Sequence, residues 1–95
     1  MDIHIKIKQR NEQLQRLRKI AGFSQSQLAT ATGINVRVLQ EYERGSRDLN
    51  GAKLSTILKL CIALDCELLE IITNEETAGL LRLYKSRTKF LDKHG

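Results

Sequence analysis

One short segment, residues 24–45, constrains the fold more than any other part of the sequence, because it encodes two helices that meet at a single glycine. Ser24 is followed three residues later by a glutamine, and this capping-box spacing predicts that a helix begins directly after Ser24. Gly33 supplies the positive φ angle that a tight turn needs, so this first helix is only about two turns long. Asn35 is a good N-cap, which predicts a second short helix over residues 36–44.

Helical patterns also fill the rest of the chain, in agreement with a composition of six glycines and no proline. An apolar stripe that starts at Leu14 predicts an earlier helix, which ends at Gly22. Asn50 is the expected N-cap of a further helix. The buried stripe of that helix is expected to consist of Leu54, Ile57, Leu58, Cys61 and Leu64.

The end of the chain predicts two more helices. A brief, very apolar one is expected at residues 68–72, and Thr73 or Asn74 would cap a last helix from Glu75. The apolar side of this last helix would consist of Leu80, Leu83, Tyr84, Phe90 and Leu91. Residues 2–8 fit either a strand or an upstream extension of the first helix. The predicted fold class is all-α.

The positive charge lies at the two ends of the chain. The formal net charge is +5, and residues 1–19 carry six basic residues against two acidic ones. Residues 80–95 carry five against one, whereas residues 20–79 carry five against eight. A basic protein of this size tends to associate with phosphates or anionic surfaces, so the charge indicates a class of partner and not a fold.

Residues 24–45, SQSQLATATGINVRVLQEYERG, resemble the helix-turn-helix of the phage repressor and Cro-type (Xre-like) family, and residues 14–72 resemble its five-helix lambda-repressor-like domain. The matching positions are Ser24 and Gln25, Leu28 and Ala29, Gly33, Glu43 to Gly45, Leu58 to Leu60, and Ala63 and Leu64. The resemblance implies a DNA-binding domain over residues 11–73. A basic extension over residues 1–10 and an additional C-terminal helix over residues 74–95 lie outside the resemblance. It also implies sequence-specific binding to double-stranded DNA by a small transcriptional repressor.

The predicted helix over residues 36–44 has one side that is free of the core, as a helix in the major groove must have. The inward positions are Ile34, Leu39 and Tyr42, and the outward positions are Val36, Arg37, Gln40, Glu41 and Arg44. By resemblance, the base-contacting residues are Val36, Arg37 and Glu41. An arginine can bind O6 and N7 of guanine, a valine can contact the methyl group of thymine, and a glutamate can accept from N4 of cytosine.

Four further residues are expected to contact DNA phosphates, namely Gln25, Asn35, Arg44 and Arg47. Gln25 begins a helix, where unpaired backbone N–H groups and the helix dipole attract a phosphate. Asn35 also has a structural role as a cap. The basic residues of the N-terminal extension could follow the DNA backbone, enter a minor groove or form only a solvated tail; they are Lys6, Lys8 and Arg10.

The resemblance also implies a structural pair, because Arg18 and Glu43 match the arginine and glutamate that pair in this family between the first helix and the end of the recognition helix. The chain departs from the family pattern at three places. The loop after Gly45 is longer than usual, Asp65 replaces a glycine after the fourth helix, and Glu67 replaces a better N-cap.

An enzyme is not expected. His4 and His94 lie at opposite ends of the chain, and the sequence has no metal-ligand spacing, no activated nucleophile and no glycine-rich phosphate loop, so neither a metal nor another cofactor is expected. Cys61 and Cys66 lie in an apolar helical pattern and are expected to be reduced core residues. No secretory signal and no membrane-spanning segment is predicted, which indicates a cytoplasmic protein.

Double-stranded DNA and a second copy of the chain are the expected partners. One short recognition helix needs a second half-site, and the apolar side of the last helix could form the seam of a homodimer. The alternative function is an antitoxin-like protein, whose same fold binds a partner toxin while the protein autoregulates its operon. The apolar side of the last helix could then be a toxin-binding arm, or simply more of the core. The acidic middle of the chain also leaves open a helix-turn-helix fold without DNA-binding activity.

Overall fold

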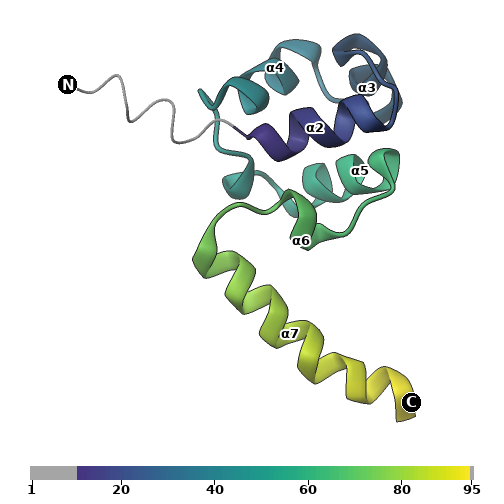
Figure 1. The fold of residues 1–95 in the computed structure, drawn as a ribbon, viewed down its shortest axis with the longest axis vertical. Coiled ribbons are helices and arrows are strands. Elements are labelled where there is room, and N and C mark those ends of the chain that lie inside the picture. Colours follow the sequence, from purple (N-terminus) through teal and green to yellow (C-terminus); the bar gives the residue numbers. More distant parts are fainter. Residues whose placement is uncertain (1–10, 95) are drawn as a thin grey trace, which may run out of the picture.

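The structure, a computed structural model, describes residues 11–94 and the side chains of residues 11–88. The described residues contain helices and no strand, which confirms the all-α class. In chain order the elements are α2 (Glu12–Ile20), α3 (Gln25–Thr32), α4 (Val36–Arg44), the 3-10 helix η1 (Leu49–Gly51), α5 (Leu54–Leu64), α6 (Leu68–Ile71) and α7 (Glu75–His94) (Figure 1). The strand or helical extension expected at residues 2–8 lies outside the described residues.

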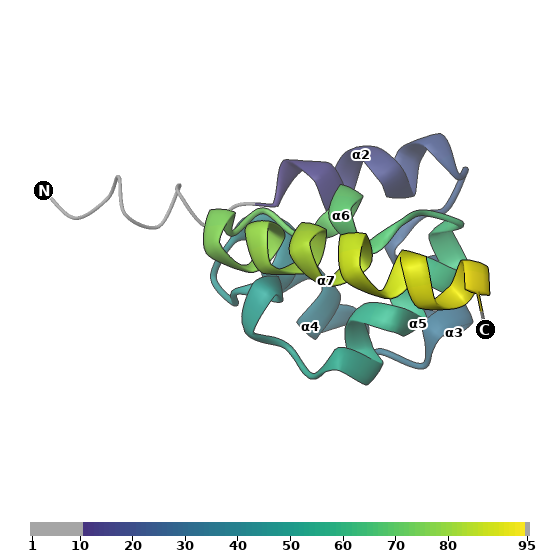
Figure 2. The ribbon, with the colours of Figure 1, turned by 90° about the horizontal axis from the view of Figure 1, so that it is seen from below.

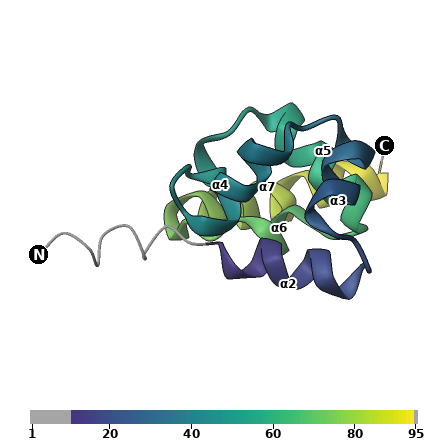
Figure 3. The ribbon, with the colours of Figure 1, turned by 90° about the horizontal axis from the view of Figure 1, so that it is seen from above.

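Helices α2 to α6 surround one apolar core, and α7 leaves this body as a long arm (Figure 1). Each element of the body contributes one fully buried side chain to the centre: Leu14, Leu28, Leu39, Leu49, Leu60 and Ile71. Seen from below, α7 lies in front of the body, and seen from above it lies behind α3 and α4 (Figures 2 and 3). The arm and the α3–α4 pair therefore occupy opposite sides of the molecule.

Side-chain caps fix the boundaries of α3 and α4 as predicted. The backbone N–H of Gln27 donates to Ser24 Oγ at 3.0 Å, and the N–H of Ser24 donates to Gln27 Oε1 at 2.8 Å, which completes the capping box. Gly33 ends α3 with a φ angle of 75°. Asn35 then caps α4, because its Oδ1 accepts from the N–H of Arg37 at 2.8 Å. Local hydrogen bonds thus fix where these two short helices begin and where the turn between them lies.

The predicted role of Asn50 as the N-cap of the next helix is wrong. Asp48 caps η1 by accepting from the Asn50 N–H at 3.0 Å, and α5 begins only at Leu54. The Asn50 side chain reaches the start of α7, where its Oδ1 accepts from the N–H groups of Thr73 and Asn74 at 2.9 and 3.1 Å. Its Nδ2 also donates to Thr73 Oγ1 at 2.9 Å. A side chain that could cap locally is used to join distant segments.

The buried side of α5 also differs from the predicted stripe. Ile57, Cys61 and Leu64 are buried as expected, but Leu60 is buried as well, and Leu54 and Leu58 are 63% and 39% exposed. Apolar residues occupy several sides of this helix, so periodicity could not select the side that faces the core.

The last two helices form where the sequence predicted them, with the brief helix ending at Ile71. Between the two candidate caps of α7 the structure selects Asn74, whose Oδ1 accepts from the N–H of Thr77 at 2.9 Å. On the expected apolar side of α7, Leu80, Leu83 and Tyr84 are exposed. The side chains of Phe90 and Leu91 lie outside the described ones.

The two replacements that depart from the family pattern have clear local consequences. Asp65 follows α5 in the left-handed conformation with a φ angle of 53°, which explains why a glycine is usual at this position. Glu67 is the N-cap residue of α6. Its backbone N–H donates to the Glu70 carboxylate at 2.8 Å, so a side chain within the helix helps to cap it.

Replacing Asp65 by glycine should raise the free energy of unfolding by up to about 1 kcal/mol, because glycine adopts positive φ without a Cβ clash. The gain is limited because glycine also has more conformational freedom in the unfolded chain. Asp65→Ala keeps the clash and should lower the free energy of unfolding. Urea unfolding of the wild type, Asp65→Gly and Asp65→Ala would measure both effects. A lower free energy of unfolding in Asp65→Gly would contradict the claim that the backbone is strained at this residue.

The two cysteines are free thiols, as expected for reduced residues. Cys61 is buried in the core, whereas Cys66 is half-buried and packs against its edge. Burial raises the pKa of both thiols, that of Cys66 to about 12, so both stay neutral at physiological pH.

Candidate nucleic-acid interface

Helices α3 and α4 are held in a fixed mutual orientation by contacts on both sides of the turn between them. Leu28 of α3 and Leu39 of α4 are fully buried. The hydroxyl of Thr32 donates to the carbonyl oxygen of Leu28 at 2.8 Å and accepts from the N–H of Ile34 at 3.3 Å. The side chain of Thr32 therefore ties the last turn of α3 to the residue that leads into α4.

The exposed side of α4 is the part of this pair that could contact a ligand. Leu39 and Tyr42 are buried and Ile34 packs against the core, as predicted. The opposite side carries the five residues expected to face outward: Arg37 and Arg44 are exposed, Val36 is 36% exposed, and Gln40 and Glu41 are half-buried. A polar helix side of this kind fits the width of the major groove of DNA.

Glu41, expected to contact bases, and Arg47, expected to contact a phosphate, are brought together by the structure. Arg47 Nε and Nη2 both lie 2.8 Å from Glu41 Oε1. The turn at Gly45 permits this, because the Arg47 N–H also donates to the Glu41 carbonyl oxygen at 3.2 Å. Glu41 is thus engaged in an ion pair, while the Arg47 side chain stays 52% exposed and positioned beside α4.

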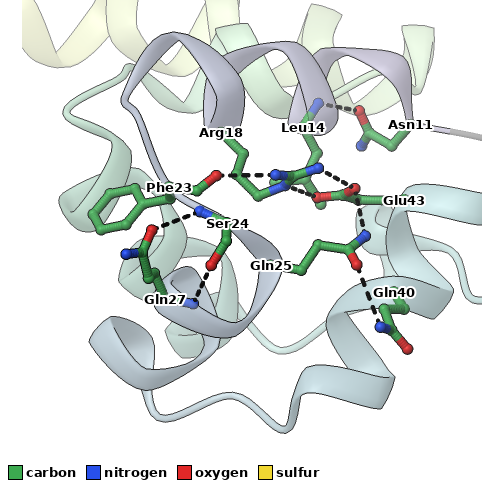
Figure 4. A network of polar contacts seen from close by, with 9 residues as sticks. All are labelled: Asn11, Leu14, Arg18, Phe23, Ser24, Gln25, Gln27, Gln40 and Glu43. Carbon is green, nitrogen blue, oxygen red and sulfur yellow. Dashed lines mark hydrogen bonds and ion pairs between the residues drawn. The ribbon is translucent and has the colours of Figure 1, made fainter.

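A buried ion pair joins α2 to the end of α4 (Figure 4). Arg18 Nε donates to Glu43 Oε2 at 2.7 Å, and Arg18 Nη2 donates to Glu43 Oε1 at 3.1 Å. The two side chains are 9% and 2% exposed. Arg18 Nη1 also donates to the carbonyl oxygen of Phe23 at 2.9 Å, which fixes the loop before α3. Such a two-point contact restrains the rotation of α4 as well as its distance from α2.

Gln25, which was expected to contact a phosphate, extends this network across to α4 (Figure 4). Its Nε2 donates to Glu43 Oε1 at 3.0 Å, and its Oε1 accepts from Gln40 Nε2 at 3.3 Å. The side-chain amide is therefore committed within the protein, and the backbone at the start of α3 is the part left for a phosphate.

The other predicted contact residues lie around the same exposed side. Asn35 is exposed and caps α4 through its side chain, while Arg44 is exposed in the last turn of α4. The basic residues Lys6, Lys8 and Arg10 lie outside the described residues.

Comparison with known proteins identifies the α3–α4 pair. Residues 14–71, more than half of the chain, match the family model described as helix-turn-helix. The chain belongs to the phage repressor and Cro-type helix-turn-helix family. A similar solved structure is the restriction-modification controller protein C.AhdI from Aeromonas hydrophila. The two chains are 35% identical with a TM-score of 0.60, over 73% of this chain and 98% of the controller. No curated protein sequence matches this chain.

As a member of this family, the protein is a DNA-binding transcriptional regulator. Among the side chains that the structure describes, those of residues 11–88, no cluster of three or more acidic, histidine or cysteine residues could hold a metal ion. In the same part of the chain, every helix is too short or too polar to span a membrane.

Sequence reasoning missed both side-chain hydrogen bonds of Gln25 and the ion pair between Glu41 and Arg47. No pattern of neighbouring residues predicts the hydrogen bond between Gln25 and Gln40, because this contact depends on how α3 and α4 cross. The ion pair between Glu41 and Arg47 could have been anticipated, since Gly45 reverses the chain between them.

Proposed function

We propose that this protein binds double-stranded DNA sequence-specifically as a homodimer, reads the major groove with α4 and represses transcription from its operator. The observation that carries the proposal is the exposed polar side of α4, held in place by the buried pair of Arg18 and Glu43. A rigid helix whose outer side is free can insert into the groove without disturbing the core.

The contacts divide into base reading and backbone anchoring. Arg37 is an exposed arginine in the first turn of α4 and would bind guanine, with Val36 beside it against a thymine methyl group. Arg44 and Arg47 would anchor phosphates, together with Asn35 and the start of α3 at Gln25. Glu41 would act in two ways, since it orients Arg47 and disfavours bases that present only acceptors to it.

The similarity to a restriction-modification controller supports a controlling role in transcription, with the genes of a restriction-modification system as the first candidates. The antitoxin-like alternative rests on a different observation, the exposed apolar side of α7. In an antitoxin, that side of α7 would bind the toxin.

Selection of bound sequences from a random duplex pool, followed by titration at several salt concentrations, would test the proposed function. The selected sites should be near-palindromes whose half-sites lie about 34–36 Å apart, one turn of DNA. The logarithm of the binding constant should fall linearly with the logarithm of the salt concentration, because phosphate contacts release counterions. Enrichment of no sequence over the starting pool would contradict sequence-specific reading.

A further inference from the structure

The corner between α5 and α6 brings two cysteines together. Cys61 lies in the last turn of α5, and Cys66 lies in the short loop that joins α5 to α6 (Figure 1). The N–H of Cys66 donates to the carbonyl oxygen of Cys61 at 3.0 Å, and Asp65 beside it has a φ angle of 53°. A helix end that closes in this way places the side chains of the two bonded residues in contact. Both residues are free thiols.

The surroundings of this thiol pair favour uncharged sulfur. Burial raises the pKa of both thiols, that of Cys66 to about 12, and the carboxylates of Glu67 and Glu70 add to the effect. Each thiol also affects the pKa of the other, as expected of neighbouring sulfur atoms. A pair of thiolates, which a soft metal ion would need, is therefore disfavoured in this corner, whereas a disulfide carries no charge.

The two thiols differ in their access to solvent. Cys61 is 6% exposed and belongs to the core, whereas Cys66 is half-buried and packs against the edge of the core. A small molecule in solution therefore meets Cys66 before Cys61. This difference gives the pair an order of reaction, in which Cys66 reacts first and Cys61 is the resolving thiol.

We propose that Cys61 and Cys66 form a reversible disulfide when the protein meets a low-molecular-weight disulfide such as oxidised glutathione. The thiolate of Cys66 attacks one sulfur atom of the oxidant and displaces one small thiol. The thiolate of Cys61 then attacks Sγ of Cys66 and displaces the second small thiol. Two protons and two electrons pass from the protein to the oxidant, which leaves as two thiols.

The disulfide acts as a clasp on the body of the protein. It closes a loop of six residues, from Cys61 to Cys66. Because the unfolded chain then has fewer conformations, the oxidised protein is more stable than the reduced one. The bond also holds the start of α6, where Glu67 Oε1 lies 3.1 Å from Lys85 Nζ of α7. Neither cysteine belongs to α3 or α4, so the clasp is independent of the proposed function.

Incubation of the full chain with excess oxidised glutathione would test the disulfide. Both cysteines lie in one tryptic peptide, residues 60–82, and mass spectrometry of this peptide should show the loss of two hydrogen atoms, reversed by dithiothreitol. Closure should be faster at higher pH, because the thiolate is the attacking species. The urea midpoint of the oxidised protein should be about 1 M higher than that of the reduced protein.

Cys66→Ser is the matched control, because it removes the more accessible thiol and leaves the core intact. Its urea midpoint should be the same with and without oxidant, whereas Cys61→Ala should stop at a mixed disulfide between Cys66 and glutathione. A wild-type chain that stops at the mixed disulfide, links two copies through Cys66 or becomes less stable on oxidation would overturn the proposal. Failure of the reduced protein to bind DNA sequence-specifically would contradict the proposed function alone.

Discussion

Replacing Glu43 by alanine is expected to lower the free energy of unfolding by about 3–5 kcal/mol, because it leaves the Arg18 guanidinium buried without its carboxylate partner. Both side chains are less than a tenth exposed, so water cannot replace the lost contacts. The Gln25 amide loses an acceptor at the same time. Urea unfolding followed by circular dichroism would measure the loss.

The ion pair between Glu41 and Arg47 is the matched control within the same protein. It has a similar distance, but the Arg47 side chain is 52% exposed, so Glu41→Ala should cost at most about 1 kcal/mol. In a double-mutant cycle, Arg18→Ala with Glu43→Ala should cost clearly less than the sum of the single changes. Additive and small losses at both pairs would show that burial does not strengthen the pair between α2 and α4.

The parts of the fold that the sequence predicted well are those determined by neighbouring residues. Ser24 with Gln27, Gly33 and Asn35 each act within one helical turn, so the start of α3, its end and the start of α4 follow from local hydrogen bonding. At Asp65 the sequence showed only that an aspartate replaces a usual glycine, and the structure adds that this residue has a positive φ angle.

The parts that the sequence could not predict depend on distant residues. Asn50 had the right chemistry for a helix cap, but its partners Thr73 and Asn74 lie more than twenty residues further along the chain. In α5 the apolar residues surround most of the helix, and only the packing of the body distinguishes buried Leu60 from exposed Leu58.

At the candidate interface the sequence predicted which residues of α4 face outward, but not the contacts between the side chains. Arg37 and Arg44 are exposed, as their positions on α4 predicted. The phosphate contact expected at Gln25 stays a prediction, but the sequence did not indicate that its side chain lies between Glu43 and Gln40. A spacing pattern can place a side chain at a helix start, but the neighbouring helix decides which partner it binds.

The two exposed arginines of α4 allow base reading to be separated from anchoring. Arg37→Ala should weaken binding to the selected operator by about 1–3 kcal/mol, or roughly 5- to 150-fold, because a bidentate contact to guanine is lost. Binding to random duplex should change much less. Arg44→Ala removes the same charge from the other end of α4 and should weaken both duplexes similarly, with a salt slope shallower by about one unit.

Titrations of both variants on operator and scrambled duplex at several salt concentrations would distinguish the two roles. Circular dichroism and urea unfolding should be unchanged in both, since each side chain is exposed and makes no ion pair among the described residues. Equal weakening of both duplexes by Arg37→Ala, together with an altered sequence preference in Arg44→Ala, would reverse the assignment. Base reading would then lie at the C-terminal end of α4, and the phosphate contacts at its N-terminal end.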